Sequence, residues 1–223
     1  ECPVVSNNSA NRFTPDVPMV VPELNAEHIN IIPAQRKRLG TKRGFIAVKS
    51  NCSLQSYVPA LFPLQEKYPI GGEEEKSEKE PLKLMGKIVG DEIVSADSPA
   101  FTAQCIRVPV SNGHLGAVFV EFEDKKPTKE EMINIWENFS GRAQELNLPS
   151  APKQFLHYFT EPDRPQIHSE RMLEHGMAVS IGRLREDTQY DYKFVCLSHN
   201  TLRGAAGGAV LLGELLAAEG YFD

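Results

Sequence analysis

The sequence predicts an α+β fold in which helices cover one face of a sheet. Strand-like segments come mostly in runs rather than in a regular alternation of strand and helix, which is typical of α+β proteins. The chain has 223 residues, 41% of them hydrophobic, enough to bury a substantial core in one large domain or two small ones. Its 16 prolines and 16 glycines have no period, which excludes collagen-like and low-complexity chains.

The first 68 residues contain two expected strands and two helical segments. These are a strand over residues 1–7, a short helix over 26–32 with Asn25 as N-cap, a strand over 43–51 and a helical stretch over 52–68. Repeated prolines between the first strand and the first helix keep that connection extended. Pro59 and Pro63 interrupt the last segment, so we expect them to kink or shorten its helix.

The rest of the chain contains a run of strands and three helices. The expected elements are a helix within 71–88, strands over 101–110 and 113–124, a helix over 127–146, strands over 176–187 and 190–200, and a final helix over about 203–219. Ser111, Asn112 and Gly113 separate the first two of these strands, which predicts a hairpin-like or neighbouring pair. Thr128 can cap the clearest helix.

Charge and cysteine content exclude several classes of protein. Thirty acidic against 24 basic residues give a net charge of −6, so a bulk basic surface for nucleic acid is missing. No apolar run approaches the roughly 18 residues that span a bilayer, and no signal peptide is visible, so no membrane is expected. Because the chain begins at Glu1 and not at methionine, we expect a fragment of a longer protein.

The four cysteines, Cys2, Cys52, Cys105 and Cys196, are far apart in the sequence. None has metal-ligand spacing, and a chain of this size does not need disulfides. We therefore expect reduced, buried thiols, no metal site and a cytoplasmic location.

Cys52 is the strongest candidate nucleophile. It lies in Ser50-Asn51-Cys52-Ser53, after an expected strand and at the start of an expected helix. Unpaired N–H groups and the positive end of the helix dipole favour a thiolate at such a position. A buried structural cysteine is the commoner alternative, but no other cysteine of this chain has this placement.

Arg107 and His114 are seven residues apart and flank an expected strand connection, so both side chains could reach one cleft. Arginine can clamp a carboxylate with two hydrogen bonds, and histidine can act as acid or base near neutral pH. The alternative is a surface arginine and a histidine in a solvated turn.

Four further residues are weaker candidates. Glu73 and Lys76 are three apart and share a helix face, but five Glu and three Lys lie between positions 73 and 83, and most are expected at the surface. Arg12 lies in a polar loop, where arginines are usually solvated. Asn200 ends an expected strand, where an amide could simply be an N-cap.

Taken in order, these pieces resemble aspartate-semialdehyde dehydrogenases of the fungal and archaeal branch. The matching stretches are VVSN and NR near the start, DVPMVVPELN, SNCS, GEEEK, CIRVPVSNGH, DRPQ, GMAVSIGRLR, HN and RGAAGGAV. SNC alone would be weak evidence, but the box with Arg107 and His114 follows it in the correct order. The resemblance spans nearly the whole chain.

The resemblance implies a fold like that of glyceraldehyde-phosphate dehydrogenase, with an N-terminal Rossmann domain for NADP and a C-terminal catalytic domain. Residues 1–223 would form the second of these, the catalytic and dimerisation domain with a mixed, mostly antiparallel sheet. The final helix would pack on the cofactor domain. A homodimer or a tetramer is the implied assembly.

The family's roles carry over to individual residues. Cys52 would attack the substrate as nucleophile, and His114 would be the general base. Arg107 would clamp the substrate carboxylate. Glu73 would face its amino group; it is chosen over the alternatives Glu74 and Glu75 for its three-residue spacing to Lys76. The remaining roles are phosphate binding by Arg12 and Lys76, and a contact of Asn200 with the nicotinamide end of NADP.

The implied reaction is the reductive dephosphorylation of 4-phospho-L-aspartate to L-aspartate 4-semialdehyde and phosphate, in the biosynthesis of lysine, threonine, methionine and isoleucine. Two departures bear on it. The N-terminal half with the phosphate loop is missing from this chain, and a family segment containing Gln-x-x-Ser-Gly is missing between Tyr68 and Gly71. The alternatives are therefore an inert dimerisation module, or a reductase for another acyl phosphate, and the chain alone is expected to be inactive.

Overall fold

The computed structural model describes residues 1–68, 78–104 and 108–223. Its main sheet has the strand order β5-β8-β7-β6. The strands are β5 (His114–Val120), β6 (Leu156–Phe159), β7 (Val179–Glu186) and β8 (Tyr192–Ser198). β8 pairs antiparallel with β5 and β7, whereas β6 pairs parallel with β7. The expected mixed, mostly antiparallel sheet of an α+β protein is confirmed.

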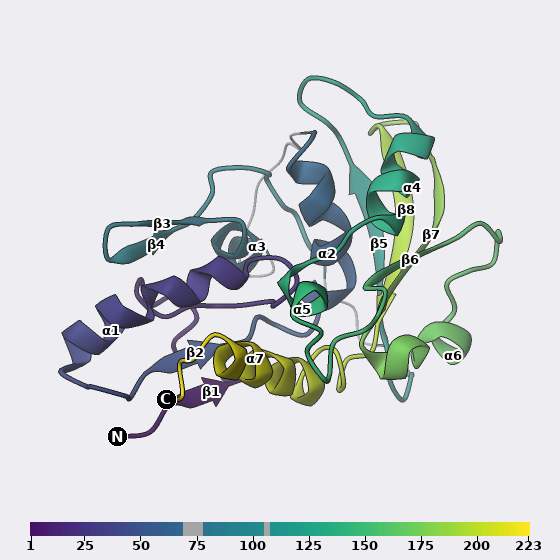
Figure 1. The fold of residues 1–223 in the computed structure, drawn as a ribbon. Helices are drawn as coiled ribbons and strands as arrows, with labels where there is room; N and C mark the ends of the chain where they lie inside the picture. Colours follow the sequence, from purple (N-terminus) through teal and green to yellow (C-terminus); the bar gives the residue numbers. More distant parts are fainter. Residues whose placement is uncertain (69–77, 105–107) are drawn as a thin grey trace.

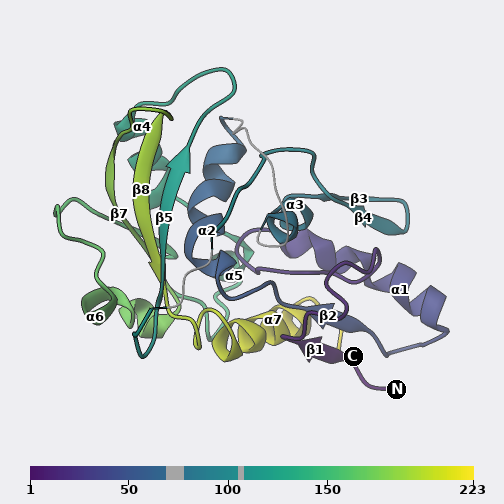
Figure 2. The ribbon, with the colours of Figure 1, turned by 180° about the vertical axis from the view of Figure 1, so that it is seen from behind.

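Two helices, α2 (Leu54–Gln65) and α4 (Lys129–Glu137), cover one face of this sheet, as expected (Figures 1 and 2). Trp136 of α4 is fully buried, and its Nε1 donates to the carbonyl oxygen of Ala60 in α2 at 2.8 Å. The Trp136 ring also lies 5.2 Å from the ring of Phe194 in β8, centroid to centroid. One indole thus ties both helices to the sheet, since a buried Trp needs both apolar contact and a partner for its N–H.

A second layer lies beside the main sheet. The parallel pair β1 (Val4–Ser6) and β2 (Ile46–Val48) packs with η1 (Ala26–Ile31), α1 (Ile32–Leu39) and the final helix α7 (Ala206–Ala218) around a second apolar core. The other elements are α3 (Lys79–Leu84), β3 (Lys87–Val89), β4 (Glu92–Val94), α5 (Arg142–Glu145), α6 (Ile167–Glu170) and η2 (Leu173–Gly176). No helix within the described ranges is long and apolar enough to cross a bilayer.

The expected strand over residues 101–110 is wrong for the part that can be checked. Residues 101–104 and 108–110 form no strand, and residues 105–107 lie outside the described chain. The Val110 N–H bonds to the Val108 carbonyl oxygen at 2.9 Å, which closes a tight turn around Pro109. Proline has no N–H to donate to a strand ladder, which disfavours a strand through Pro109. The described partner of β5 is β8 and not the predicted preceding strand. The β3–β4 hairpin and β6 were not predicted.

Two local expectations also need correction. The helix α2 runs through both Pro59 and Pro63 without ending at either. Asn25 occupies the N-cap position of η1, as predicted, but its side chain makes no capping bond: its Oδ1 accepts from the Val21 N–H at 2.8 Å and its Nδ2 donates to the Met19 carbonyl oxygen at 2.9 Å. The asparagine therefore closes the preceding turn instead of the helix end.

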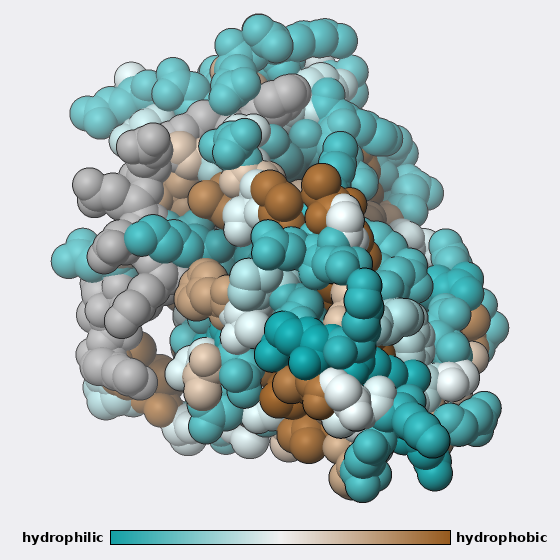
Figure 3. Space-filling model, turned by 90° about the vertical axis from the view of Figure 1, so that its left-hand side faces the viewer, coloured by the Kyte–Doolittle hydropathy of each residue, from teal (hydrophilic) through white to brown (hydrophobic). Residues whose placement is uncertain are grey.

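The outer face of the second layer is mostly polar. Figure 3 shows the side of the molecule that carries α1 and the β3–β4 hairpin, with apolar side chains in patches separated by hydrophilic ones. The exposed large apolar residues of these elements are Leu39, Val89 and Val94. Isolated exposed apolar residues are normal on a protein surface.

Lys49, directly after β2, is a buried lysine. Its Nζ donates to the carbonyl oxygens of Gly204 at 2.7 Å and Ser50 at 3.3 Å. Its stem lies against Gly208 of α7, where an added β-carbon would come within 2.4 Å of Lys49 Cε. Burial first, and then the charge of Arg203, lower the pKa of Lys49 to about 7.

The variant Lys49→Met should reveal this titration in the stability of the protein. Below pH 7 Lys49 is protonated in both states, and the folded state bears the free-energy cost of a buried charge. Above pH 7 Lys49 loses its proton in the folded state but keeps it in the unfolded chain. The wild type should therefore gain stability relative to Lys49→Met as the pH rises from about 7 to about 10, by up to about 1.4 kcal/mol per pH unit. Urea unfolding at pH 7 and pH 9 measures this, and a difference that does not change with pH would contradict it.

Thr128 caps α4 as expected. Its side chain accepts from the Glu131 N–H at 3.1 Å, and the Glu131 carboxylate accepts from the Thr128 N–H at 2.7 Å, a complete capping box.

Thr128→Ala should lower the free energy of unfolding by about 1 kcal/mol, because one N–H at the helix start loses its partner. Thr128→Ser keeps the hydroxyl and should stay close to wild type. Chemical denaturation of the three proteins measures the effect, and equal losses in both variants would show that the methyl group matters rather than the cap.

Candidate active site

Cys52 lies between a strand and a helix, as predicted. β2 ends at Val48 and α2 begins at Leu54, and Cys52 is partly exposed. Its Sγ donates to Oδ1 of Asn51 at 3.6 Å, and the same oxygen accepts from the N–H and the hydroxyl of Ser53, each at 3.0 Å. The thiol is thus held at the open N-terminal end of a helix, where unpaired N–H groups favour negative charge.

His114 begins β5, opposite Ser198 in the ladder with β8. Side chains two apart in a strand share a face, so His114 lies on the same face as Gly116. An added β-carbon at Gly116 would lie 3.6 Å from the hydroxyl of Ser56 in α2, so this face of β5 looks toward the first turn of α2. His114 and Cys52 therefore belong to the same end of the interface between sheet and helix.

Two buried polar atoms at this place have no hydrogen-bond partner within the described part of the chain. They are Nδ1 of His114 and Oγ of Ser198, which are neighbours across the ladder. Buried polar groups are nearly always paired, so unpaired ones need an explanation. Here both side chains lie at the end of the β5–β8 ladder, on the sheet face that looks toward α2.

Asn200 follows β8, and its Oδ1 accepts from the Gly113 N–H at 2.8 Å. The alternative role as a helix N-cap is excluded, because α7 begins at Ala206 and the residue before it is Ala205. The structure brings Asn200 next to His114 in this way. The pKa of the neighbouring His199 is lowered by burial, and its Nδ1 accepts from the N–H groups of Thr201 and Leu202.

Arg12 is buried and not solvated as its polar loop suggested. Its Nη1 forms an ion pair with Glu80 at 2.8 Å, and its Nε and Nη2 donate to the carbonyl oxygens of Lys49 and Asn7. Through the bond to Lys49, the guanidinium lies against the segment that leads into Cys52. Its pairing with Glu80 was not foreseen, and its role in phosphate binding stays a prediction.

The charged segment between positions 73 and 83 was expected mostly at the surface, and this is wrong for three of its members. Glu78, Glu80 and Lys83 are buried. Lys83 Nζ donates to the carbonyl oxygens of Arg12, Thr14 and Val17, at 2.7 to 3.0 Å. Buried charges persist only when they are paired or hydrogen-bonded in this manner. Glu73, Lys76 and Arg107 lie outside the described residues.

A second buried ion pair supports the Cys52 segment from the other side. Arg203, 1% exposed, binds both carboxylate oxygens of Glu23, at 2.6 and 2.7 Å, and donates through Nε to the side chain of Gln55. Gln55 in turn donates to the Ser50 hydroxyl at 2.6 Å. Sequence reasoning missed this group, because its members come from three distant parts of the chain.

The described cysteines differ in accessibility. Cys2 is exposed, Cys52 partly exposed and Cys196 buried, and all three are free thiols. The expectation of buried thiols is confirmed for Cys196 and wrong for Cys2. Burial strongly raises the pKa of Cys196, which makes it inert. No group of three or more metal-ligating side chains was found in the described ranges.

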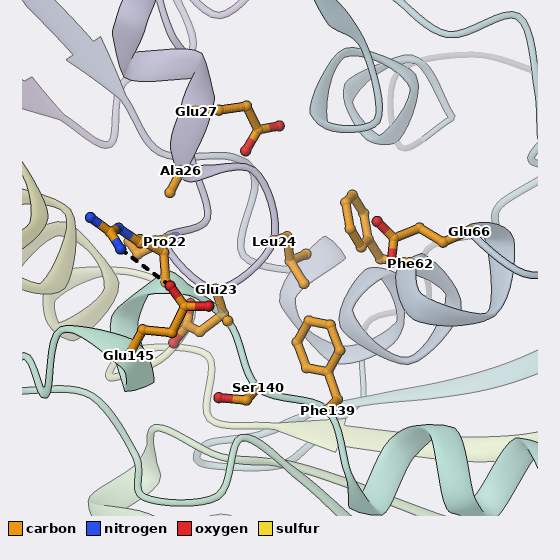
Figure 4. Close-up of a pocket in the computed structure, with 12 residues that line it drawn as sticks. Pro22, Glu23, Leu24, Ala26, Glu27, Phe62, Glu66, Phe139, Ser140 and Glu145 are labelled. Carbon is orange, nitrogen blue, oxygen red and sulfur yellow. Dashed lines mark hydrogen bonds and ion pairs between the residues drawn. The ribbon is translucent and has the colours of Figure 1, made fainter.

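The cleft drawn in Figure 4 lies elsewhere. It has a volume of about 220 Å³ and is lined by residues from the segment before η1, from α2 and from the region around α5. Its charged lining consists of Glu23, Glu27, Glu66 and Glu145, together with Arg142, which is paired with Glu145 and Glu219. Such a mostly acidic lining repels anions, and none of the described candidate residues belongs to it.

Comparison with known proteins gives consistent results. Residues 67–203 match the family model described as the semialdehyde dehydrogenase dimerisation domain. The aspartate-semialdehyde dehydrogenase of Aspergillus fumigatus is 35% identical over 260 aligned residues, covering 99% of this chain and 72% of that protein. The aspartate-semialdehyde dehydrogenase of Archaeoglobus fulgidus is 38% identical over 247 aligned residues. The alignment covers 97% of this chain and 70% of that protein.

The first of these alignments is at least 37 positions longer than the chain of 223 residues (260 against 223). The fungal relative therefore carries residues within the matched span that this chain lacks. The alignment length does not say where they lie, so the missing segment between Tyr68 and Gly71 stays a prediction.

Solved structures agree with the sequence comparisons. The Candida albicans aspartate-semialdehyde dehydrogenase, solved with NADP, superposes with a TM-score of 0.83 at 35% identity, covering 97% of this chain and 71% of that one. A Vibrio cholerae aspartate-semialdehyde dehydrogenase II is similar in fold, with a TM-score of 0.70 at 21% identity. The agreement of family model, relatives and fold shows that this chain belongs to the aspartate-semialdehyde dehydrogenase family.

Proposed function

We propose that the polypeptide containing this chain is an NADP-dependent aspartate-semialdehyde dehydrogenase that works through a covalent intermediate on Cys52. The observation that carries the proposal is the position of Cys52 at the N-terminal end of α2, on the sheet face that His114 shares. The family relationship supports this reading. The substrates are 4-phospho-L-aspartate in the biosynthetic direction, and L-aspartate 4-semialdehyde with phosphate in the reverse direction.

The proposed chemistry in the reverse direction begins with attack of the Cys52 thiolate on the aldehyde carbon. The thiolate forms when His114, with its Nδ1 or Nε2 as base, takes the proton of the Cys52 thiol, and this proton returns to the sulfur when the thiol is released. Loss of hydride leaves a thioester on Cys52, and phosphate cleaves it to form the acyl phosphate and the free thiol. Each protein group returns to its starting state, so one cysteine and one histidine suffice for the covalent cycle.

Recognition of the small ligands is divided among charged side chains. In the proposal, Arg107 binds the substrate carboxylate, Glu73 the amino group, and Lys76 and Arg12 the phosphate. The zwitterionic amino-acid end of the substrate is bound best by one cationic and one anionic side chain, and phosphate is bound well by two cationic ones. The buried guanidinium of Arg12, next to the Cys52 segment, supports its part of this arrangement.

NADP, when bound, supplies the hydride acceptor or donor. The residue of this chain proposed to hold it is Asn200. Its Oδ1 accepts from the Gly113 N–H, which fixes the amide, and its Nδ2 would be the donor to a carboxamide oxygen. The Candida albicans relative solved with NADP supports the choice of cofactor. We further propose a cytoplasmic location, in keeping with the free thiols of Cys2, Cys52 and Cys196.

Cys52→Ala should abolish phosphate-dependent reduction of NADP in the full-length polypeptide, because no other group can form the thioester. Cys196→Ala is the matched control: its thiol is fully buried in the core and cannot reach a substrate, so turnover per folded molecule should stay close to wild type. The assay follows absorbance of NADPH with and without phosphate. Turnover that survives in Cys52→Ala would remove Cys52 from the mechanism.

The proposed assembly is a homodimer formed through the sheet face opposite α2. Leu115 and Phe119 of β5 point to this side and are 53% and 56% exposed. Two large apolar side chains on one strand of an uncovered sheet face are typical of a contact surface, and the matched family model is a dimerisation domain.

Phe119→Asp should weaken self-association at least about 100-fold, since it places a charge in the centre of a desolvated contact. Val89→Asp, on the β3–β4 hairpin and 62% exposed, is the control for a charge on an apolar surface residue. Sedimentation at several concentrations measures both. Equal weakening by the two substitutions, or none by either, would rule out this sheet face as the dimer contact.

A further inference from the structure

Glu80 joins two parts of the proposed active site. Its Oε1 accepts from the Arg12 guanidinium at 2.8 Å, and its Oε2 accepts from the backbone N–H of Asn51 at 2.7 Å. Asn51 is the residue before the candidate nucleophile, and Arg12 is the described candidate for phosphate binding. One carboxylate from α3 thus holds groups that are 39 residues apart in sequence, counted from Arg12 to Asn51.

The contact continues from Asn51 to the sulfur atom. The Asn51 side chain accepts from Cys52 Sγ at 3.6 Å and from Ser53 at 3.0 Å. Asn51 is therefore fixed by Glu80 at its backbone and fixes Cys52 through its side chain. Arg12 reinforces the same segment through its bond to the Lys49 carbonyl oxygen at 3.0 Å.

We propose that Glu80 is a positioning residue that sets the place of the Cys52 thiol relative to Arg12. This inference rests on the proposed function of Cys52 as nucleophile. Both partners of Glu80 belong to loops, which on their own hold side chains less well than helices or strands do. Attack of phosphate on a thioester requires the two reacting atoms in contact, and small misplacements lower the rate steeply.

Glutamine cannot replace Glu80 in this role. A carboxylate accepts at both oxygens, whereas an amide has one acceptor oxygen and one donor nitrogen. Arg12 and the Asn51 N–H both donate, so Glu80→Gln leaves one of them facing another donor. Because the side chain keeps its size, the substitution removes one of the two hydrogen bonds that connect the loops and leaves the packing unchanged.

Glu170 provides a closely matched control. It is 6% exposed, as is Glu80, and it also pairs with an arginine, Arg164, while accepting from a backbone N–H, that of Gln166, at 2.5 Å. It lies in α6, and its hydrogen bonds within the described part of the chain go to Arg164 and Gln166 and not to Cys52 or Arg12. Glu170→Gln therefore removes the same kind of ion pair and leaves the Glu80 link intact.

The experiment compares wild type, Glu80→Gln and Glu170→Gln in the full-length polypeptide. Steady-state kinetics give kcat and the KM for phosphate. Alkylation by iodoacetamide at pH 7, followed peptide by peptide, gives the reactivity of Cys52, and the buried Cys196 reports in the same sample whether the fold is intact.

Glu80→Gln should lower kcat at least about tenfold and raise the KM for phosphate, while Cys52 is alkylated about threefold faster and Cys196 stays protected. The thiol reacts faster with iodoacetamide because the loop that holds it loses its link to Glu80 and opens more readily, and turnover falls because the position of the thiol is lost. Glu170→Gln should change neither.

Several outcomes would overturn the inference: kcat within twofold of wild type, equal effects of both substitutions, or exposure of Cys196 in Glu80→Gln, which would show a purely structural role. If wild type itself shows no phosphate-dependent turnover, the proposed function fails. In that case the alkylation rate of Cys52 still tests whether Glu80 positions the thiol. Equal rates in wild type and Glu80→Gln would reject the positioning role.

Discussion

The anchoring of residues 49–52 is the constraint on which the rest of the site depends. This short segment leaves β2 and enters α2, and three distant parts of the chain bond to it. Arg12 and Glu80 hold its backbone, Gly204 accepts from Lys49, and Gln55 reaches back to Ser50. Without these bonds, a cysteine on a connecting loop would have no fixed direction toward His114.

The charged groups around this segment lie between two apolar cores. One core fills the space between the main sheet and its helices, and the other lies under α7 and α1. Ion pairs in such a place gain little net stability, since removing charges from water is costly. Their value is geometric, because a buried pair such as Arg203 with Glu23 has few alternative partners and so admits few arrangements.

Local patterns were enough to predict part of this structure from the sequence. A β-branched segment followed by a helical one placed Cys52 correctly between strand and helix, and alternation in β5 placed His114 at a strand end. Glu80 and Lys83 could not be predicted, because Lys83 binds carbonyl groups 66 to 71 residues away and a charge run gives no sign of its partners. The strand over 101–110 failed because the turn at Pro109 outweighs the β-propensity of its neighbours.

The contact between Lys49 and Gly208 limits how this protein can vary. The lysine stem and the backbone carbonyl oxygen of Arg203 would lie 2.4 and 2.6 Å from a β-carbon at position 208, so a side chain there would require a shift of the backbone as well as of Lys49. Positions 49 and 208 are 159 apart in sequence yet act as one packing unit (208 − 49). A side chain at position 208 would shift α7 against the Cys52 segment, so sequence drift in the final helix is coupled to the geometry of the candidate active site.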